Sequence, residues 1–272
     1  MYKDFYGLKE KPFTITPNSR FFFSSAKHVE ALSTMLYAVK ERKGFVVVTG
    51  EVGSGKTTVC RALLNQLGKD TEFALITNTH IGAKDLLSTI LEEFGVDYTG
   101  GSKARLLSQL NAFLIEKLRE DKNVVLVIDE AQNLKPSVLE EVRMLSNLET
   151  EHEKLIQIIF LGQPELRQKL AMARLEQLRQ RVAIYFHLTP LSREDTVAYI
   201  EHRLRIASGG DEQFFTEEAL EMVAEFSNGV PRIVNQICDS ALLSGYVRDQ
   251  RIIDARLMEE VIGESPMRQI IS

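Results

Sequence analysis

The stretch Phe45-Val-Val-Val-Thr49-Gly50-Glu51-Val52-Gly53-Ser54-Gly55-Lys56-Thr57-Thr58 joins an apolar run to a glycine-rich loop. The loop matches the pattern G-x-x-x-x-G-K-[ST], and Val59, Leu63 and Leu67 follow it at helical spacing. This pattern holds phosphate when it stands between a buried strand and a helix, because its glycines let backbone N–H groups converge on phosphate oxygens. The alternative is a glycine turn with an incidental Lys-Thr pair.

The loop predicts a nucleotide site that uses both backbone and side chains. We expect Lys56 to place its charge at the β- and γ-phosphates, and the Thr57 hydroxyl to ligate Mg²⁺. The residues expected to hold ATP in this loop are Gly50, Glu51, Val52, Gly53, Ser54, Gly55, Lys56, Thr57 and Thr58.

A second candidate feature is the acidic pair that follows the apolar run Val124–Ile128. Acids at the end of a buried parallel strand emerge at the edge where open α/β sheets bind ligands. We expect Asp129 to orient the Mg²⁺ shell and Glu130 to polarise the attacking water as the catalytic base. Two acids after a strand are by themselves more often a turn, but beside a phosphate loop they favour hydrolysis.

Runs that are apolar at consecutive positions recur along the chain and are typical of strands buried on both faces. They are Phe45–Thr49, Phe73–Thr77, Val124–Ile128, Ile156–Leu161 and Ile184–Leu188. Helical patterns separate them, which predicts an α/β fold: a five-stranded parallel sheet flanked by helices on both faces. The pattern leaves the strand order open.

After Leu188 the chain has helical patterns only. Ser192 and Thr216 are predicted N-caps, Gly229 ends the second helix, and Pro231 suits the first turn of the third. A fourth pattern covers Arg251–Ile262. We therefore expect residues 1–190 to form the α/β nucleotide-binding core and residues 191–272 a small all-helical lid, with the boundary near Pro190.

Composition restricts the protein class. The 272 residues are 44% hydrophobic and 26% charged, which is typical of a folded globular chain. The net charge of −5 is opposite in sign to that of most proteins that coat nucleic acid. No apolar run approaches the ~18 residues of a membrane span, and Met1–Phe5 has no apolar segment of a signal peptide behind it. Cys60 and Cys238 cannot form a disulfide framework, so we expect a cytoplasmic location.

Several segments together resemble the AAA+ ATPases. These are Gly50–Thr57, Asp129–Gln132, Leu161–Leu166, Leu178–Arg181 and Gly229–Asn235. The opening stretches Phe5–Phe13 and Pro17–Phe23 are a more specific signature. They resemble the cytoplasmic ATPase region of the general secretion pathway protein A (ExeA/GspA-like) family. The likeness extends more loosely to the helper ATPases of DNA transposition.

The resemblance implies roles for residues that spacing alone does not assign. Gln163 would sense the γ-phosphate, and Arg232 would read the bound nucleotide from the lid. Arg181, or alternatively Arg179, would be the arginine finger offered to a neighbouring copy. The alternatives are that both arginines are solvated cations at a helix end, and that Arg232 is an ordinary surface residue.

The resemblance also places residues 1–27 near the adenine. The segment from Pro12 to Pro17 would lie against the base, with Phe13 as an apolar wall. Asn78 would restrain Glu130 until a partner binds, although a turn residue is an equal alternative for Asn78.

The expected function is Mg²⁺-dependent ATP hydrolysis in a ring or other homo-oligomer, coupled to assembly or remodelling of a type II secretion or other cell-envelope complex. The alternatives are a DNA-dependent ATPase of the transposition-helper type, which the acidic charge disfavours, and a nucleotide-gated scaffold, which Glu130 disfavours. Family members normally continue into a membrane span and a cell-wall-binding region. Because the sequence ends at Ser272 with neither, we expect a fragment, or a relative whose membrane contact a partner supplies.

Overall fold

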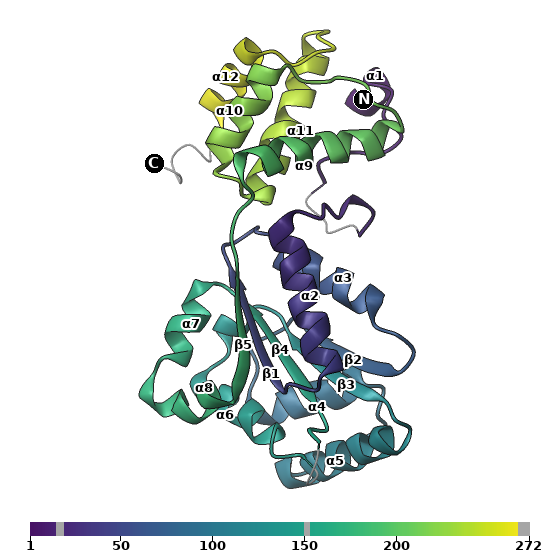
Figure 1. Cartoon of the computed structure of the whole chain (residues 1–272), viewed down its shortest axis with the longest axis vertical. Coiled ribbons are helices and arrows are strands. Elements are labelled where there is room, and N and C mark those ends of the chain that lie inside the picture. The colour runs from purple at the N-terminus through teal and green to yellow at the C-terminus, as the bar shows by residue number, and fades with distance from the viewer. Residues whose placement is uncertain (15–18, 150–152, 266–272) are drawn as a thin grey trace. The chain divides into compact units, whose positions relative to one another are not determined.

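The computed structural model of the chain describes residues 1–14, 19–149 and 153–265 (Figure 1). The chain divides into two compact units. The sheet unit comprises Val29–Gly50 and Val59–Leu188; the helical unit comprises Met1–His28, Glu51–Thr58 and the described part of Thr189–Ser272. The domain boundary expected near Pro190 stays a prediction, because compact units are not thereby independently folding domains.

The sheet unit contains a five-stranded parallel sheet, as predicted. Its strands are β1 (Phe45–Gly50), β2 (Thr71–Ile76), β3 (Asn123–Ile128), β4 (Gln157–Gly162) and β5 (Val182–Leu188). They lie in the order β2-β3-β4-β1-β5, so β1 is hydrogen-bonded to both β4 and β5. Because all neighbours are parallel, the carboxyl ends of β1, β3 and β4 lie at one edge of the sheet.

The strands differ in burial more than the sequence pattern indicates. β1 and β4 are buried at every residue, and β3 at every residue but its first. The prediction that all five runs are buried on both faces was wrong for β2 and β5, where Phe73 and Tyr185 are exposed. These two are the edge strands of the sheet, each with a neighbouring strand on one side only.

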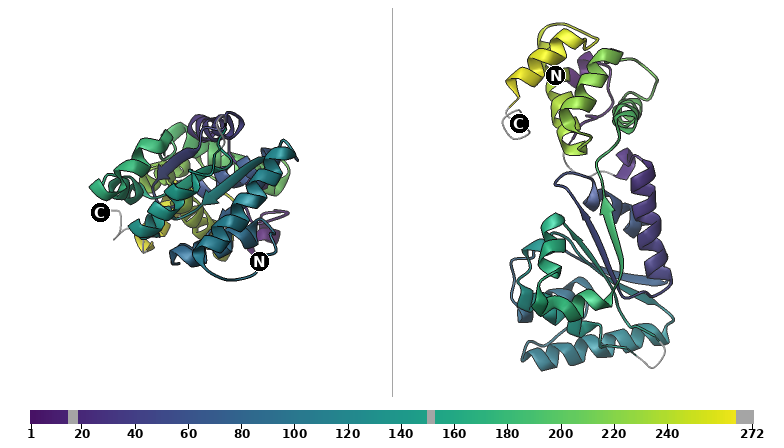
Figure 2. Two further views of the ribbon diagram at one scale, coloured as in Figure 1. Left: turned by 90° about the horizontal axis from the view of Figure 1, so that it is seen from below. Right: turned by 60° about the vertical axis from the view of Figure 1, so that its left-hand side comes forward.

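Helices lie on both sides of the sheet (Figures 1 and 2). The helices and short 3₁₀ turns between residues 26 and 181 are α2 (Ala26–Lys40), α3 (Lys56–Gln66), α4 (Ala83–Glu93), α5 (Lys103–Arg119), η2 (Ala131–Asn133), α6 (Pro136–Leu145), α7 (Pro164–Leu170), η3 (Ala173–Leu175) and α8 (Glu176–Arg181). The apolar stripe predicted around residues 106–118 is the inner face of α5, where Leu106, Leu110 and Leu114 are fully buried. They join a core that includes Leu126 and Phe160 of the sheet.

The helical unit contains the four helices predicted after Leu188. They are α9 (Arg193–Ser208), α10 (Glu217–Ser227), α11 (Pro231–Val247) and α12 (Ala255–Glu264). Both predicted caps are formed: the Ser192 hydroxyl accepts from the Asp195 backbone N–H at 3.0 Å, and the Thr216 hydroxyl from that of Ala219 at 3.3 Å. No helix within the described ranges has the length and hydropathy to span a membrane.

The N-terminal segment supplies part of the core of the helical unit. This segment includes α1 (Tyr2–Phe5) and η1 (Ser19–Phe21). Tyr2, Tyr6 and Phe13 are buried in the same apolar cluster as Ile237 of α11. The Tyr6 hydroxyl donates to the Gln250 carbonyl at 2.9 Å. These contacts join the two ends of the chain within one unit.

Gly229 is a position where this unit requires glycine. Its φ of +72° lies in the left-handed region, and its carbonyl accepts from the Leu191 N–H at 2.9 Å. A Cβ at this position would overlap the backbone carbonyl of Leu191. Gly7 in the same unit has a similar φ of +70° but open space around it.

We expect Gly229→Ala to lower the free energy of unfolding by ~3 kcal/mol, because left-handed strain and backbone overlap add. Gly7→Ala is the matched control and should cost about 1–2 kcal/mol, from φ alone. Urea unfolding followed by circular dichroism measures both. Equal losses in the two variants would show that the overlap at Leu191 is relieved without cost.

Candidate functional site

The glycine-rich loop belongs to the helical unit and has the backbone that its sequence predicts. Gly53 and Gly55 have φ of +80° and +99°, backbone conformations that glycine adopts readily and that residues with a Cβ rarely adopt. Lys56 is buried, and its Nζ donates to the Glu51 carbonyl at 2.9 Å. The Ser54 hydroxyl is also buried and has no hydrogen-bond partner among the described residues. A buried cation and an unpaired hydroxyl in a glycine loop fit a bound phosphate.

The other loop residues that the sequence predicts to hold ATP are next to these in the chain. Gly50 is the last residue of β1, Val52 is exposed, and Thr57 and Thr58 stand in the first turn of α3. The Thr57 hydroxyl is thus placed directly after Lys56, at a helix N-terminus.

Arg232 lies next to the loop within the helical unit. It stands in the first turn of α11, where its backbone N–H donates to the Gly53 carbonyl at 3.3 Å. A Cβ on Gly53 would overlap the Arg232 side chain, so this contact also requires glycine. The structure brings Arg232 and the loop together, while the sensing role of Arg232 stays a prediction.

His28 is a residue of this site that the sequence analysis did not single out. Its Nε2 lies 3.1 Å from the Ser54 carbonyl, and its Nδ1 lies 2.7 Å from the Ser25 hydroxyl. Since a carbonyl only accepts, Nε2 carries the proton and Nδ1 accepts from Ser25. Burial lowers the pKa of His28, against the opposing effects of the Ser54 hydrogen bond and the Asp195 charge. His28 therefore braces the loop as a neutral imidazole.

The acidic pair lies in the sheet unit, directly after β3. Asp129 is buried, and its Oδ1 accepts from the Glu130 backbone N–H at 2.9 Å. Glu130 has a φ of 51° and a ψ of 37°, a left-handed conformation that is uncommon for a residue with a side chain. The Thr79 hydroxyl donates to the Glu130 carbonyl at 3.2 Å. Strain of this kind is concentrated at functional sites.

Two glutamines hold the Glu130 carboxylate. Its Oε2 accepts from the Nε2 of Gln163 at 3.2 Å and also from the Nε2 of Gln132. The Oε1 of Gln132 accepts from the Gln163 backbone N–H at 3.1 Å, which closes the triangle. Gln163 is therefore close to Glu130, as a shared site requires. Gln132 was missed as a site residue, although it belongs to the segment Asp129–Gln132 that carries the family resemblance.

Asn78 does not touch Glu130 through any contact recorded for the described residues. Its Oδ1 accepts from the His80 backbone N–H at 3.2 Å, which is a turn contact. The neighbouring Thr79 makes the contact to Glu130 instead. This geometry favours the turn interpretation of Asn78.

The two finger candidates have different surroundings. Arg181, at the end of α8, is half-buried and donates to the Ser146 hydroxyl. Arg179 is exposed and donates to the Ala171 carbonyl at 3.3 Å. Neither contact tests a role toward a neighbouring copy.

The proposed adenine wall, Phe13, is only 2% exposed and packs in the core of the helical unit. Part of the segment from Pro12 to Pro17, residues 15–18, lies outside the described residues. The expectation that this segment contacts adenine therefore stays a prediction.

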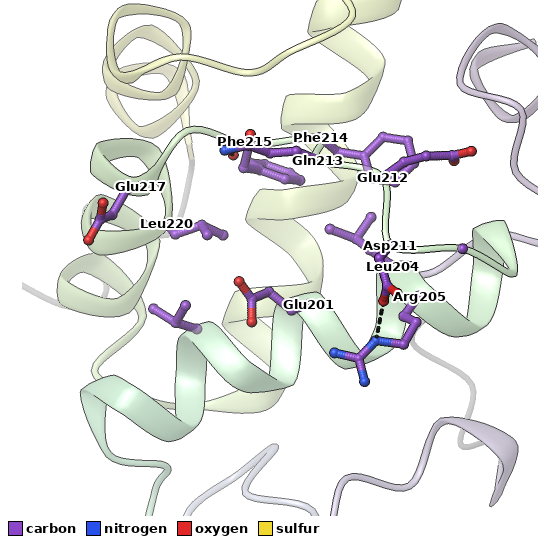
Figure 3. A pocket seen from close by; sticks show the side chains of 12 residues that line it. Glu201, Leu204, Arg205, Asp211, Glu212, Gln213, Phe214, Phe215, Glu217 and Leu220 are labelled. Carbon is purple, nitrogen blue, oxygen red and sulfur yellow. Dashed lines mark hydrogen bonds and ion pairs between the residues drawn. The ribbon is translucent and has the colours of Figure 1, made fainter.

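A pocket of about 510 Å³ in the helical unit lies between α9, α10 and the residues that connect them (Figure 3). Four carboxylates line it, from Glu201, Asp211, Glu212 and Glu217. The one lining arginine, Arg205, is paired with Asp211 at 3.0 Å. Because this lining would repel an anion, the pocket is not a candidate for the phosphates of a nucleotide.

The comparisons with known proteins agree with this architecture. Residues 39–170 match the family model described as an AAA domain. That region contains the glycine-rich loop, the acidic pair and four of the five parallel strands. The matched region lies within the P-loop core of the fold, and the helical C-terminal region that the sequence predicts follows it.

The predicted resemblance to the secretion family is confirmed. The chain is 45% identical over 249 residues to general secretion pathway protein A of Aeromonas hydrophila, in an alignment that covers 91% of this chain and 45% of that protein. The chain thus spans about half the length of this relative. It is also 25% identical over 258 residues to an HTH-type transcriptional regulator of Methanocaldococcus jannaschii, which covers 89% of this chain and 62% of the regulator.

Solved structures share the fold at low identity. Cdc6p of Pyrobaculum aerophilum superposes with a TM-score of 0.70 at 16% identity, over 98% of this chain and 73% of that one. The ADP form of ORC2 of Aeropyrum pernix gives 0.68 at 13%, over 96% and 72%. RuvB of Thermotoga maritima gives 0.61 at 19%, over 89% and 70%. Identities this low establish the fold alone.

The buried His28 predicts a pH-dependent contribution to stability. The unfolded chain binds a proton at His28 near the ordinary pKa of 6.5, whereas the folded chain resists it. The free energy of unfolding therefore decreases as the pH falls below 6.5, and this destabilising contribution of His28 is absent at higher pH. The His28→Gln variant lacks this contribution. The amount by which the free energy of unfolding of the wild type exceeds that of the variant should therefore shrink as the pH is lowered from 7.5 to about 5.5.

Urea unfolding of both proteins at the two pH values measures this difference. Groups that do not act on His28, such as the partly buried His202, are present in both proteins and cancel in the comparison. A difference that stays constant with pH would contradict the neutral state of His28.

Proposed function

We propose that this AAA+ protein binds ATP with Mg²⁺ and hydrolyses it, and that hydrolysis drives the remodelling of a cell-envelope secretion assembly. The observation that carries the proposal is the Glu130 carboxylate, held by Gln132 and Gln163 directly after a buried strand, in a chain whose β1 leads into a G-x-x-x-x-G-K-[ST] loop. A protein that only bound nucleotide would have no use for this aligned carboxylate.

Binding is assigned to the loop residues and the helix that follows them. The backbone N–H groups of residues 53–57 and the N-terminus of α3 would face the phosphates, and Lys56 would supply the compensating charge. The Thr57 hydroxyl and the Asp129 carboxylate are hard oxygen ligands that suit Mg²⁺. When bound, the ion neutralises charge on the phosphate oxygens.

Hydrolysis is assigned to Glu130. Two amide donors fix the direction of its carboxylate, so that it can accept a proton from a water placed in line with the terminal phosphate. Gln163, which donates to this carboxylate, would link the base to the state of the nucleotide, as predicted for a sensor. Arg232 would do the same from α11, through its contact with the loop at Gly53.

The partner assignment rests on the relative from Aeromonas hydrophila, whose name places it in the general secretion pathway. We propose a homo-oligomer that works at the cytoplasmic side of such an assembly. The net charge of −5 favours this over action on DNA. ATPase assays with and without DNA, at low and moderate salt, separate the two, since salt-sensitive stimulation would favour the DNA-dependent alternative.

We expect Lys56→Ala to weaken ATP binding at least ~10-fold, because a charge-assisted contact is lost. Glu130→Gln should keep ATP binding and lose about 10²- to 10⁴-fold in turnover, because an amide cannot accept the proton. Calorimetric titration and a phosphate-release assay measure these effects. The control Glu165→Gln changes an exposed carboxylate on α7 and should alter neither. Turnover by Glu130→Gln at the wild-type rate would exclude Glu130 as the base.

An arginine supplied by a neighbouring copy predicts that turnover per molecule rises with protein concentration. Arg181→Ala or Arg179→Ala, whichever removes the finger, should lose about 10³-fold or more. Mixing that variant with Glu130→Gln should restore part of the activity, because some interfaces then combine an intact arginine with an intact base. No recovery in either mixture, while sedimentation shows mixed oligomers, would contradict a shared site.

A further inference from the structure

A lysine of α7 binds the segment that directly follows Glu130. Lys169, the next-to-last residue of α7, is half-buried. Its Nζ donates to the carbonyl of Leu134 at 2.9 Å and also to the carbonyl of Gln132. Both carbonyls belong to the C-terminal end of η2, the 3₁₀ turn that begins immediately after Glu130. Lys169 therefore attaches the far end of this turn to a separate helix.

The Lys169 ammonium group has no acidic partner in the part of the chain that the structure describes. Its recorded acceptors are the two carbonyls of the turn. Burial lowers the pKa of Lys169, and the Arg174 charge acts in the same direction. Burying a charged group is costly unless hydrogen bonds satisfy it, so the two carbonyl contacts are what keep this cation in place.

The turn that Lys169 binds follows a strained residue. Glu130 has a left-handed φ of 51°, and such a conformation persists only where the surrounding contacts determine it. Before the turn, the Asp129 carboxylate accepts from the Glu130 N–H at 2.9 Å, and the Thr79 hydroxyl donates to the Glu130 carbonyl at 3.2 Å. Within the turn, the Asn133 N–H donates to the same carbonyl at 2.9 Å. Lys169 adds a contact at the other end of the turn.

Gln132 connects the backbone of the turn to the Glu130 carboxylate. Its Nε2 donates to that carboxylate, and its Oε1 accepts from the Gln163 N–H at 3.1 Å. Its backbone carbonyl is one of the two that Lys169 binds. Because α7 begins directly after Gln163 and ends at Leu170, the residues at its two ends hold the side chain and the backbone of Gln132 respectively.

We propose that Lys169 is a positioning residue for the Glu130 carboxylate: it fixes the backbone of η2 and, through Gln132, the direction of the carboxylate. This inference rests on the proposed function, in which Glu130 accepts a proton from the attacking water. Small displacements of a reacting group lower the rate steeply. Since the recorded contacts of Lys169 are with η2, its removal should lower turnover and leave ATP binding unchanged.

The test compares Lys169→Met and Lys169→Arg with the wild type, each as the full chain. Methionine keeps an apolar stem but has no donor, whereas arginine keeps a charged donor. Lys169→Met should lower kcat about 10- to 100-fold, with KM for ATP and the calorimetric affinity for ATP unchanged. Lys169→Arg should recover most of the lost turnover. A phosphate-release assay and calorimetric titration measure these effects.

Two controls separate positioning from a general loss of structure. Lys103→Met removes the same charge from α5, where Lys103 is paired with Glu141, and should turn over ATP like the wild type. In the Glu130→Gln background, Lys169→Met should lower the residual turnover less than ~2-fold, because the base that it positions is already absent.

Three results would overturn the inference. The first is a wild-type kcat in Lys169→Met, and the second is an equal fold loss of turnover with and without the Glu130→Gln substitution. The third is ATP binding that weakens by the same factor as turnover. If urea unfolding shows that Lys169→Met does not fold, Lys169→Gln, which keeps an amide donor, takes its place in the same comparisons.

Hydrogen exchange distinguishes failure of this inference from failure of the proposed function. The N–H groups of Asn133 and Leu134 donate to carbonyls at the start of the turn. Lys169→Met should speed their exchange at least ~10-fold, because the contacts to a charged group are lost, whereas Lys103→Met should not. Faster exchange without ATP turnover by the wild type would reject hydrolysis and keep Lys169 as the residue that holds the turn. Unchanged exchange would overturn the inference whatever the turnover.

Discussion

The parallel pairing of β1 with β4 and β5 is the constraint on which the rest of the structure depends. Parallel strands end at a common edge, so the segments after β1, β3 and β4 all start there. Within β1 and β4 every residue is buried, which leaves little place for polar chemistry along the strands. The candidate functional groups are therefore concentrated at strand ends: the loop after Gly50, Asp129 and Glu130 after Ile128, and Gln163 after Gly162.

The features that could be predicted from sequence are those with a local physical cause. An apolar run bounded by polar residues indicates a buried strand wherever it occurs, and the five runs became the five strands. Ser192 and Thr216 could be identified as caps because an N-cap acts on a backbone N–H three residues away. The glycines of the loop were predictable because their backbone conformation excludes other residues.

The features that could not be predicted depend on contacts between residues distant in sequence. Strand order, and with it the edge position of β2 and β5, is defined by pairing between strands distant in sequence rather than by any single run. His28 meets the loop across 26 residues, and Gln163 meets Glu130 across 33. A lone histidine carries no periodic signal, so only the folded chain shows that His28 is used. Gln163 was named from the family resemblance, but its contact with Glu130 appears only in the folded chain. Gln132 could have been noted from its place in the family pattern.

The helical unit is discontinuous in sequence, and this affects how the protein can be divided. Its core needs Tyr2, Tyr6 and Phe13 as well as α9–α12, and the Arg203 guanidinium of α9 donates to the Pro12 carbonyl. A fragment that starts at residue 189 would expose the apolar surfaces that these aromatic rings cover, and would be prone to aggregate. An expression tag fused directly to Met1 would have to leave the Tyr2 side chain buried in this core. Circular permutation that joins the helices directly to the first residues is the more rational way to isolate this unit.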